Sequence, residues 1–306
     1  MTFAWLRAPI VVLCLLLAAC AQPVNECDLV RITHLPLSVN HRLLTVPVGI
    51  NGQAVSMLVD TGAERTMITE ETAERLKVTR DPRFMTRSGG VGGVTQSADA
   101  RVDSFVLGGV GFPIDRVSVN RLGPGVPFEG ILGADILLAF DLDIDVPGGA
   151  LSLYRIRRCA VADPPWPERA VPIAGVTARR DRMMVPIEVN GVEGIALLDT
   201  GAQTSTLGAS FARRLGLTDQ VLASSQALTI RGVGPGTLQA RIQRFRTVRL
   251  GPVVGTNVLL PVLPMDIGFG DALIGQDFLH GRRMWVSFPM RRLFISQHGH
   301  EMLLRP

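Results

Sequence analysis

Two stretches of the chain alternate between apolar and polar positions in the same way. Residues 46–66 read VPVGINGQAVSMLVDTGAERT, and residues 185–205 read VPIEVNGVEGIALLDTGAQTS. Alternation with a period of two predicts β-strands, and Asn-Gly between two such runs is the strongest short signal for a hairpin. Each stretch therefore predicts a β-hairpin, turning at Asn51-Gly52 or at Asn190-Gly191, whose second strand leads into Asp-Thr-Gly-Ala.

The two stretches belong to an internal duplication. The second copy follows the first at a constant offset (185 − 46 = 139), without a gap. After Asp-Thr-Gly-Ala, each copy predicts a short helix, beginning near Thr69 or near Gly208. A glycine-rich segment follows at 89–93 or at 232–236, and then another alternating run. A repeat of this length indicates two homologous structural units in one chain.

The two copies also end alike. Ile131-Leu132-Gly133 corresponds to Leu273-Ile274-Gly275, at a slightly larger offset (275 − 133 = 142). We therefore expect an N-terminal lobe over residues 28–160 and a C-terminal lobe over residues 170–298, joined by a proline-rich linker at 161–169. Short alternating strands, glycine turns and one or two short helices per lobe predict an all-β, bilobal fold with a pseudo-twofold axis.

Composition and charge are consistent with this organisation. The chain has 306 residues, of which 47% are hydrophobic, and this suits one large or two medium domains. The net charge is +4, and almost every basic residue is an arginine. The arginines are scattered and not interleaved with aromatic residues, so a solvated surface explains them better than nucleic-acid binding. Contact with acidic lipid headgroups stays open as a minor role.

Residues 1–20 resemble a bacterial lipoprotein signal peptide. Arg7 precedes an apolar run over residues 8–19, which is too short to cross the hydrocarbon core of a membrane. The run ends in Leu-Ala-Ala-Cys, so Cys20 is expected to be acylated and to become the mature N-terminus. This predicts a lipid-anchored protein of the bacterial cell envelope, on the periplasmic face of the outer membrane. A plain signal peptide is the alternative.

Two cysteines remain after this processing, Cys27 and Cys159. An oxidising compartment favours a disulfide between them, and two buried free thiols are the alternative. The sequence has no zinc motif, no Walker motif and no Gly-x-Ser-x-Gly motif. We therefore expect neither a metal nor a cofactor.

Two Asp-Thr-Gly-Ala turns allow chemistry that one turn does not. A single Asp60 is equally well explained as a turn residue that accepts hydrogen bonds from its own backbone. A duplicated turn in the same strand context favours a pair, Asp60 and Asp199, facing each other across the pseudo-twofold axis. Two close carboxylates cannot both ionise cheaply, so the pair shares a proton. One member can then act as base while the other acts as acid.

These motifs resemble the retropepsin-like aspartic peptidases. Residues 44–157 and 184–296 each resemble one retropepsin subunit, so this chain is similar to a viral dimer fused into one polypeptide. The resemblance covers about three-quarters of the mature chain and implies a pepsin/retropepsin-like acid-protease fold. It implies that Asp60 and Asp199 are catalytic and that Ile-Leu-Gly and Leu-Ile-Gly pass behind them as packing.

The resemblance also implies supporting roles for the rest of each turn. Thr61 and Thr200 would hydrogen-bond across the lobes, and Gly62 and Gly201 would permit the tight turn that points the carboxylates inward. Pepsins carry a hydroxyl residue where both copies here have alanine. Without that donor the ionised pair is less stabilised, so we expect a pH optimum less acidic than that of pepsin.

The two glycine-rich segments resemble the tips of retropepsin flaps, which fold over the substrate and exclude water. The expected flap residues are Gly90, Val91, Gly92, Gly232, Val233 and Gly234. A dinucleotide-type phosphate loop is the alternative, and the missing β-α-β pattern disfavours it. The substrate is expected to be an extended segment of a peptide or unfolded protein that pairs its backbone with the flaps.

Asp135 and Asp277 follow the glycine at the end of each copy, and we interpret them as helix N-caps. Taken together, the sequence predicts a lipid-anchored aspartic endopeptidase, a monomer whose two lobes form an intramolecular pseudo-dimer. Two alternatives remain: a non-catalytic peptide-binding or scaffolding lipoprotein with the same fold, and a structural envelope lipoprotein. The presence of both aspartates favours the enzyme.

Overall fold

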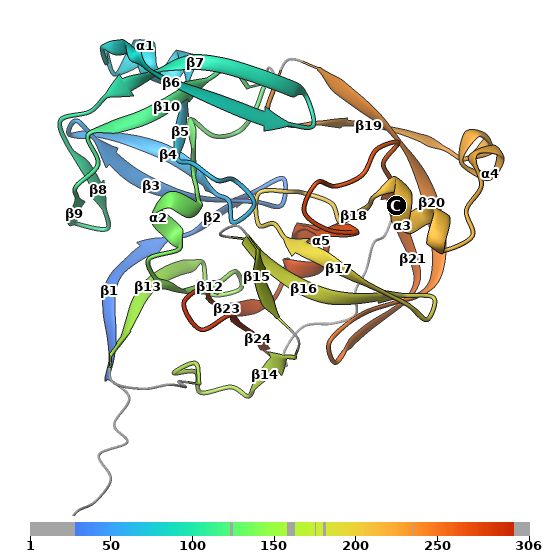
Figure 1. Ribbon diagram of the computed structural model, residues 1–306. Helices are drawn as coiled ribbons and strands as arrows, with labels where there is room; N and C mark the ends of the chain where they lie inside the picture. Colours follow the sequence, from blue (N-terminus) through green and yellow to red (C-terminus); the bar gives the residue numbers. More distant parts are fainter. Residues whose placement is uncertain are drawn as a thin grey trace, which may run out of the picture.

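Strands dominate the part of the chain that the structure describes, with 56% of residues in strands and 10% in helices. The computed structural model describes residues 28–122, 125–157, 163–174, 176–179, 182–234 and 236–296. Its two lobes lie side by side, with the N-terminal lobe in blue and green and the C-terminal lobe in yellow to red (Figure 1). This confirms the predicted all-β, bilobal fold. The expected signal peptide, Cys20, Cys27 and Cys159 lie outside the described residues.

The elements of the N-terminal lobe are β1 (Asp28–Pro36), β2 (Ser38–Asn40), β3 (Leu43–Ile50), β4 (Gln53–Val59), β5 (Met67–Thr69), α1 (Glu70–Arg75), β6 (Arg80–Gly90), β7 (Gly93–Arg101), β8 (Phe105–Leu107), β9 (Val110–Phe112), β10 (Arg116–Asn120), β11 (Gly130–Leu132), α2 (Ala134–Leu137), β12 (Asp141–Asp145) and β13 (Ala150–Arg157).

The elements of the C-terminal lobe are β14 (Ala170–Ile173), β15 (Thr177–Arg179), β16 (Arg182–Val189), β17 (Val192–Leu198), β18 (Thr206–Leu207), α3 (Ala209–Arg214), α4 (Asp219–Ser224), β19 (Ala227–Arg231), β20 (Thr237–Leu250), β21 (Val253–Val262), β22 (Ala272–Ile274), α5 (Gln276–Leu279), β23 (Arg283–Ser287) and β24 (Arg292–Ser296).

The duplicated hairpins fold as their sequences predict. β3 pairs with β4 and β16 pairs with β17, each pair antiparallel and turning at Asn-Gly. Asn51 and Gly52 have φ angles of 51° and 75°, and Asn190 and Gly191 have 51° and 84°. Positive φ at both central residues is the geometry that matches the twist of a two-residue hairpin, and asparagine and glycine adopt it at the lowest cost. The predicted helices are also present, since Thr69 caps α1 and Gly208 precedes α3.

The described strands form three sheets, two within the lobes and one shared between them. The N-terminal lobe contains a ten-stranded sheet and the C-terminal lobe an eight-stranded sheet. The third sheet has six strands in the order β1-β13-β12-β23-β24-β14, so β12 of one lobe pairs with β23 of the other. This sheet lies beneath both lobes in Figure 1 and joins them through backbone hydrogen bonds.

An arginine crosses the shared sheet where the lobes meet. Arg283 of β23 makes two hydrogen bonds to Asp143 of β12, at 2.9 and 2.8 Å, and a further contact of 3.2 Å to Glu168. Trp166 donates its indole N–H to Asp143 at 3.1 Å. The hydrogen bond to Asp143 raises the pKa of Arg283 further above its usual range, so the arginine stays charged. The described part of the linker is thereby held against the shared sheet.

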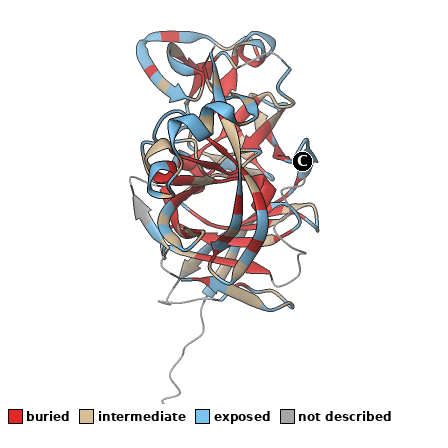
Figure 2. Cartoon of the chain, turned by 90° about the vertical axis from the view of Figure 1, so that its right-hand side faces the viewer, coloured by how far each residue is buried: buried red, intermediate tan, exposed pale blue. Residues whose placement is uncertain are grey.

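Apolar side chains of both lobes join in one continuous core, which includes strands of the shared sheet. Figure 2 shows this pattern, with buried positions on the inner strands and exposed positions on the outer hairpins. Among the described residues, no helix combines the length and the apolar character that crossing a membrane requires. β1 and β13 pair antiparallel, with Asp28 opposite Arg157, at the outer edge of the shared sheet.

Candidate active site

The two aspartates occupy equivalent positions at the ends of β4 and β17. β11 runs parallel to β4, and the Asp60 N–H donates to the Leu132 carbonyl at 3.1 Å. β22 runs parallel to β17, and the Asp199 N–H donates to the Ile274 carbonyl at 3.0 Å. The apolar-apolar-glycine segments therefore lie directly behind the aspartates and fix where each carboxyl leaves its strand.

Two buried threonines connect the turns of opposite lobes. The Thr61 N–H donates to Thr200 Oγ1 at 3.0 Å, and the Thr200 N–H donates to Thr61 Oγ1 at 3.1 Å. Each hydroxyl donates in turn to a strand carbonyl of the other lobe, Thr61 to Leu198 and Thr200 to Val59, both at 2.7 Å. Both threonines are completely buried, so these four hydrogen bonds form away from water. They hold the two aspartates at a fixed separation.

Replacing Thr200 by Val should destabilise the protein by about 2–4 kcal/mol, because valine matches the shape but removes two hydrogen bonds. The Thr61 N–H would lose its acceptor and the Val59 carbonyl would lose its donor, both in a buried place. The measurement is the free energy of unfolding in urea. The exposed Thr256 on β21 provides the control, and Thr256→Val should change stability by less than about 0.5 kcal/mol. Equal effects of the two variants would contradict the role assigned to Thr200.

Each turn also supplies hydrogen bonds to its own carboxyl. Asp60 Oδ1 accepts from the N–H groups of Gly62 and Ala63, at 2.8 and 2.9 Å. Asp199 Oδ1 accepts from Gly201 and Ala202, at 2.9 and 3.1 Å. The two carboxyls are therefore oriented in the same way within their own turns.

The two turn glycines contact the carboxyl of the opposite lobe. A Cβ atom on Gly62 would lie 2.5 Å from Asp199 Cγ, and a Cβ atom on Gly201 would lie 2.3 Å from Asp60 Cγ. Neither glycine has a positive φ. A positive φ is therefore not what requires glycine at these two positions; the close approach of the opposite carboxyl is the physical reason.

The environment of the pair favours protonation. Burial raises the pKa of Asp60, while the N–H groups of Ala63 and Gly62, a hydrogen bond with Asp199 and, least of all, the charge of Arg182 oppose this effect. Burial also raises the pKa of Asp199 well above its ordinary value, and the negative charge of Asp60 raises it further. Two such carboxyls retain one proton at a pH where isolated aspartates would be ionised. This is the ionisation state that acid–base catalysis requires.

The glycine-rich tips of the two long hairpins meet. The tip between β6 and β7 bonds to the tip between β19 and β20, since Gly92 N–H donates to the Val233 carbonyl at 2.9 Å and Gly236 N–H donates to the Gly92 carbonyl at 2.8 Å. A Cβ atom on Gly90 would lie 2.8 Å from the Val233 carbonyl oxygen. A Cβ atom on Gly232 would lie 3.2 Å from Val91. Small residues are therefore needed for the tips to approach this closely.

The second tip also reaches the other lobe. Val233 packs against a buried apolar cluster of the N-terminal lobe that includes Leu58 and Ile131. Leu58 lies two residues before Asp60 in β4. The structure thus brings all six expected flap residues together, in a bridge between the lobes that reaches the strand carrying Asp60.

Two family models of proteases match the chain, one in each lobe. A model described as aspartyl protease matches residues 46–136, and one described as gag-polyprotein putative aspartyl protease matches residues 185–281. Each match contains one Asp-Thr-Gly-Ala turn, and together they span more than half of the chain. The chain belongs to the retropepsin-like aspartyl proteases.

The solved structures that resemble this aspartyl protease chain include an aspartic proteinase from Irpex lacteus. That match has 16% sequence identity and a TM-score of 0.49, and it covers 86% of this chain and 96% of that chain. A comparison with curated protein sequences finds no significant match. Among the described residues, no group of three or more His, Cys, Asp and Glu side chains is arranged to hold a metal ion.

The interpretation of Asp135 and Asp277 as helix N-caps is wrong. The N-cap positions of α2 and α5 are Gly133 and Gly275, and neither makes a side-chain cap. Asp135 instead accepts hydrogen bonds from the N–H and the hydroxyl of Thr66, at 2.8 and 2.6 Å. Each aspartate lies two positions after the N-cap glycine of its helix, so it cannot cap the helix, and it reaches the segment after the Asp-Thr-Gly-Ala turn.

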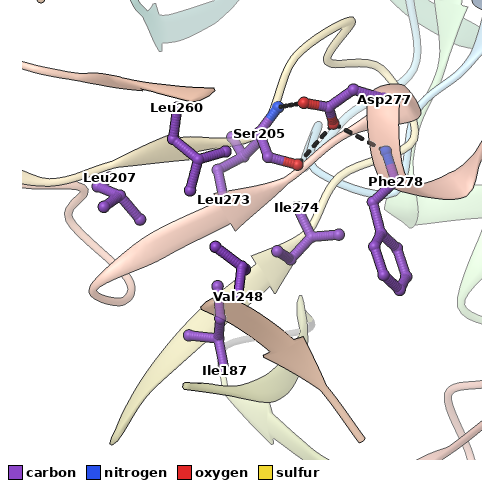
Figure 3. A pocket seen from close by; sticks show the side chains of 9 residues that line it. All are labelled: Ile187, Ser205, Leu207, Val248, Leu260, Leu273, Ile274, Asp277 and Phe278. Atoms are coloured by element: carbon purple, nitrogen blue, oxygen red, sulfur yellow. Dashed lines mark hydrogen bonds between the residues drawn. The ribbon is translucent and has the colours of Figure 1, made fainter. Parts of the chain in front are cut away.

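The same contact recurs in the C-terminal lobe. Asp277 accepts from the Ser205 N–H at 2.8 Å and from the Ser205 hydroxyl at 2.6 Å, as Figure 3 shows beside a small apolar void of about 10 Å³. A void of this size is at the lower limit for one water molecule, and its apolar lining does not favour one. Burial raises the pKa of Asp277, and the hydrogen bonds from Ser205 and the Phe278 N–H oppose this. Asp277 therefore stabilises the segment that follows the Asp199 turn, through its hydrogen bonds with Ser205.

Sequence reasoning missed Arg182, at the start of β16, which reaches the segment after Asp60 through Glu64. Arg182 is 6% exposed, and its Nη1 donates to Glu64 Oε1 of the opposite lobe at 2.8 Å. At the repeat offset of 139, Arg182 corresponds to Leu43 and Glu64 corresponds to Gln203. The sequence did contain a signal for it, because the first copy has an apolar leucine, Leu43, where the second has the charged Arg182.

Proposed function

We propose that this protein is an aspartic endopeptidase that hydrolyses peptide bonds by a water molecule activated between Asp60 and Asp199. The observation that carries the proposal is the placement of both carboxyls in one rigid frame, with a pKa raised by burial in each. A pair that shares one proton can take a proton from water and give a proton to the departing amide without a metal.

Substrates are proposed to be extended segments of peptides or unfolded proteins. The two flap hairpins already bond to each other through backbone groups, and an extended peptide can pair with strand edges in the same way. Closed flaps would exclude bulk water from the pair and strengthen its electrostatics. A folded substrate would first have to release a loop or an unfolded segment.

The proposed cellular setting is the bacterial envelope. A lipid attached to Cys20 would hold the protease at the periplasmic face of the outer membrane, where unfolded exported proteins are available as substrates. The chain would act as a monomer, because both halves of the pair come from one polypeptide.

The proposal is tested by incubating the purified protein with a peptide library at roughly pH 3 to 8 and identifying new termini by mass spectrometry. We expect internal cleavage of extended peptides by the native protein and none by Asp60→Asn. Binding of the peptides without cleavage at any pH would instead favour a non-catalytic, peptide-binding function for the same fold. Equal cleavage by Asp60→Asn would exclude the shared pair.

A further inference from the structure

The apolar cluster that receives the tip of the second flap is separate from the main core of the protein. Its four buried members, which we call the flap-tip cluster, are Leu43, Leu58, Met67 and Ile131. None of them belongs to the continuous core that joins the lobes. Val59 of β4 and Leu132 of β11, which follow two of them directly, do belong to that core. Because successive side chains of a strand point to opposite faces, the flap-tip cluster lies on the face of these strands that is turned away from the core.

The flap-tip cluster borders the catalytic turn of the N-terminal lobe. Ala63 packs against it, and the Ala63 N–H donates to Asp60 Oδ1 at 2.9 Å. Leu58 lies two residues before Asp60, the spacing at which side chains of an extended strand share a face. An extended peptide whose backbone lies at the Asp60 carboxyl is therefore within reach of this cluster with one of its side chains.

Val233, at the tip of the second flap, fills this place in the structure. Its side chain is half-buried and packs against the flap-tip cluster of the opposite lobe. Its carbonyl accepts the Gly92 N–H at 2.9 Å, so the backbone of the tip is hydrogen-bonded while the side chain lies in an apolar site. Proteins hold extended peptides by the same combination, with backbone hydrogen bonds for affinity and side-chain pockets for specificity. The tip is thus bound as a short peptide would be.

The equivalent place in the C-terminal lobe is less apolar. Met67 of β5 lies opposite Ile131 of β11, and Thr206 of β18 lies opposite Leu273 of β22. A hydroxyl residue therefore stands in the second lobe where the first has a long apolar side chain. The strand pairing is the same in both lobes, so the difference lies in the side chains.

A buried charge adds to this difference. Arg182 is 6% exposed and stands where the first lobe has Leu43. Leu197, the counterpart of Leu58, is buried but joins neither of the two apolar clusters among the described residues. Val91, at the tip of the first flap, joins neither cluster either. An aliphatic side chain gains little at such a place, because it would have to cover a charged group.

We propose that the flap-tip cluster binds one aliphatic side chain of the substrate, on one side of the scissile bond only, and that Val233 occupies this site until the substrate displaces it. This inference rests on the proposed function and names the substrate class within it. The fitting substrate is an extended peptide with valine, leucine or isoleucine beside the scissile bond, since burial of such a side chain is favourable. The counterpart with Arg182 and Thr206 would not select an aliphatic residue.

Peptide binding to Asp199→Asn, measured by calorimetry in the absence of turnover, tests the site. The probes are the hexapeptides Ala-Ala-Ser-Ser-Ala-Ala, Ala-Ala-Val-Ser-Ala-Ala and Ala-Ala-Val-Val-Ala-Ala. The first valine should lower Kd by at least about tenfold, as expected for an apolar pocket, and the second should add less than about threefold. Equal gains from both valines would show two aliphatic sites, and no gain would show none. Either result would overturn the proposal.

Val233→Ser, in the same Asp199→Asn background, tests whether the flap tip competes for the site. Serine does not fill an apolar cluster, so the state that can bind a peptide becomes more populated. The peptide with one valine should then bind at least about threefold more tightly. Val254→Ser changes an exposed valine of β21 in the same lobe and is the matched control, which should leave Kd unchanged. Unchanged or weaker binding to Val233→Ser would contradict a displaced occupant, because a tip that only covers the substrate cannot compete with it.

Met67→Thr copies the residue of the second lobe into the first. The gain from the first valine should fall by at least about threefold, because the site loses apolar contact area. Thermal unfolding checks that the variant folds, and Val233→Ser, at a half-buried tip, decides the question if it does not. A gain that Met67→Thr leaves undiminished would show that the valine binds elsewhere.

Cleavage of a peptide library by the native protein separates this inference from the proposed function. Valine, leucine and isoleucine should be enriched on one side of the cleaved bonds and not on the other. Enrichment on both sides would keep the proposed function and overturn the inference. A native protein that cleaves no peptide would remove the proposed function, whereas the binding measurements would still show whether the flap-tip cluster takes an aliphatic side chain.

Discussion

Replacing Asp199 by Asn is expected to abolish peptide hydrolysis and, at the same time, to stabilise the folded protein at neutral pH. Asparagine keeps the oxygen that accepts from the N–H groups of Gly201 and Ala202, so the turn should retain its geometry. It cannot hold or release the shared proton, and the loss of acid–base catalysis should reduce kcat/KM by at least about 10³-fold.

The gain in stability follows from the direction of the pKa shift. Burial raises the pKa of Asp199 in the folded protein above its value in the unfolded chain. The folded state therefore binds the proton more tightly, and this favourable contribution is complete below the unfolded pKa. It is lost as the pH rises through the folded pKa. Asparagine carries no charge at any pH, so Asp199→Asn avoids this loss and should be more stable than the native protein at pH 7.

Thermal unfolding measured at several pH values checks this expectation. Each kcal/mol of stabilisation should raise Tm by about 2–4 °C for a chain of this size, and the difference should vanish at low pH. Asp266→Asn is a control of opposite sign, because hydrogen bonds from Ser210 lower the pKa of Asp266. Its stabilising contribution is present above the unfolded pKa and is lost as the pH falls. A lower Tm of Asp199→Asn at neutral pH would show that the surroundings of Asp199 do not disfavour its ionised form.

Several features of the site could be predicted because they repeat. The Asn-Gly hairpins, the helices after Thr69 and Gly208, and the facing of two Asp-Thr-Gly-Ala turns all depend on local patterns that occur twice at one offset. Duplication distinguishes these motifs from chance matches, since a chance motif is not expected to recur in the same strand context. The threonine contacts follow from the family resemblance and not from the sequence itself.

Other features depend on how the two lobes contact each other, and no local sequence pattern predicts those contacts. The six-stranded sheet pairs β12 with β23 from opposite lobes, and Arg283 reaches Asp143 across it. Helix α4 belongs to the C-terminal lobe alone. Asp135 is easily mistaken for a cap because a carboxylate near a glycine at the start of a helix resembles one. Its carboxylate instead accepts hydrogen bonds from Thr66, which is distant in the sequence.

The second large effect is expected for Gly201→Ala, which places one methyl group between the two lobes. The added Cβ would lie 2.3 Å from Asp60 Cγ, so either the carboxyl of Asp60 or the backbone of the turn must move. Misplacement of a reacting group by about 1 Å can reduce the rate about 10²-fold, and we expect at least that loss in kcat/KM. Overpacking of this kind also costs about 1–3 kcal/mol of stability.

Gly268→Ala provides the matched control for this prediction. Gly268 lies in the same lobe, has no positive φ, and a Cβ atom there would meet no atom within 4 Å. The control should keep both kcat/KM and Tm near native values, so a loss confined to Gly201→Ala would come from the contact with Asp60. Gly62→Ala should behave like Gly201→Ala, because its Cβ would lie 2.5 Å from Asp199 Cγ.

If Gly201→Ala retained activity within about threefold of native, the two carboxyls could not be as closely packed against the opposite turns as the structure shows. Each glycine of Asp-Thr-Gly would then serve its own turn, and the two lobes would not depend on each other for the placement of the catalytic groups.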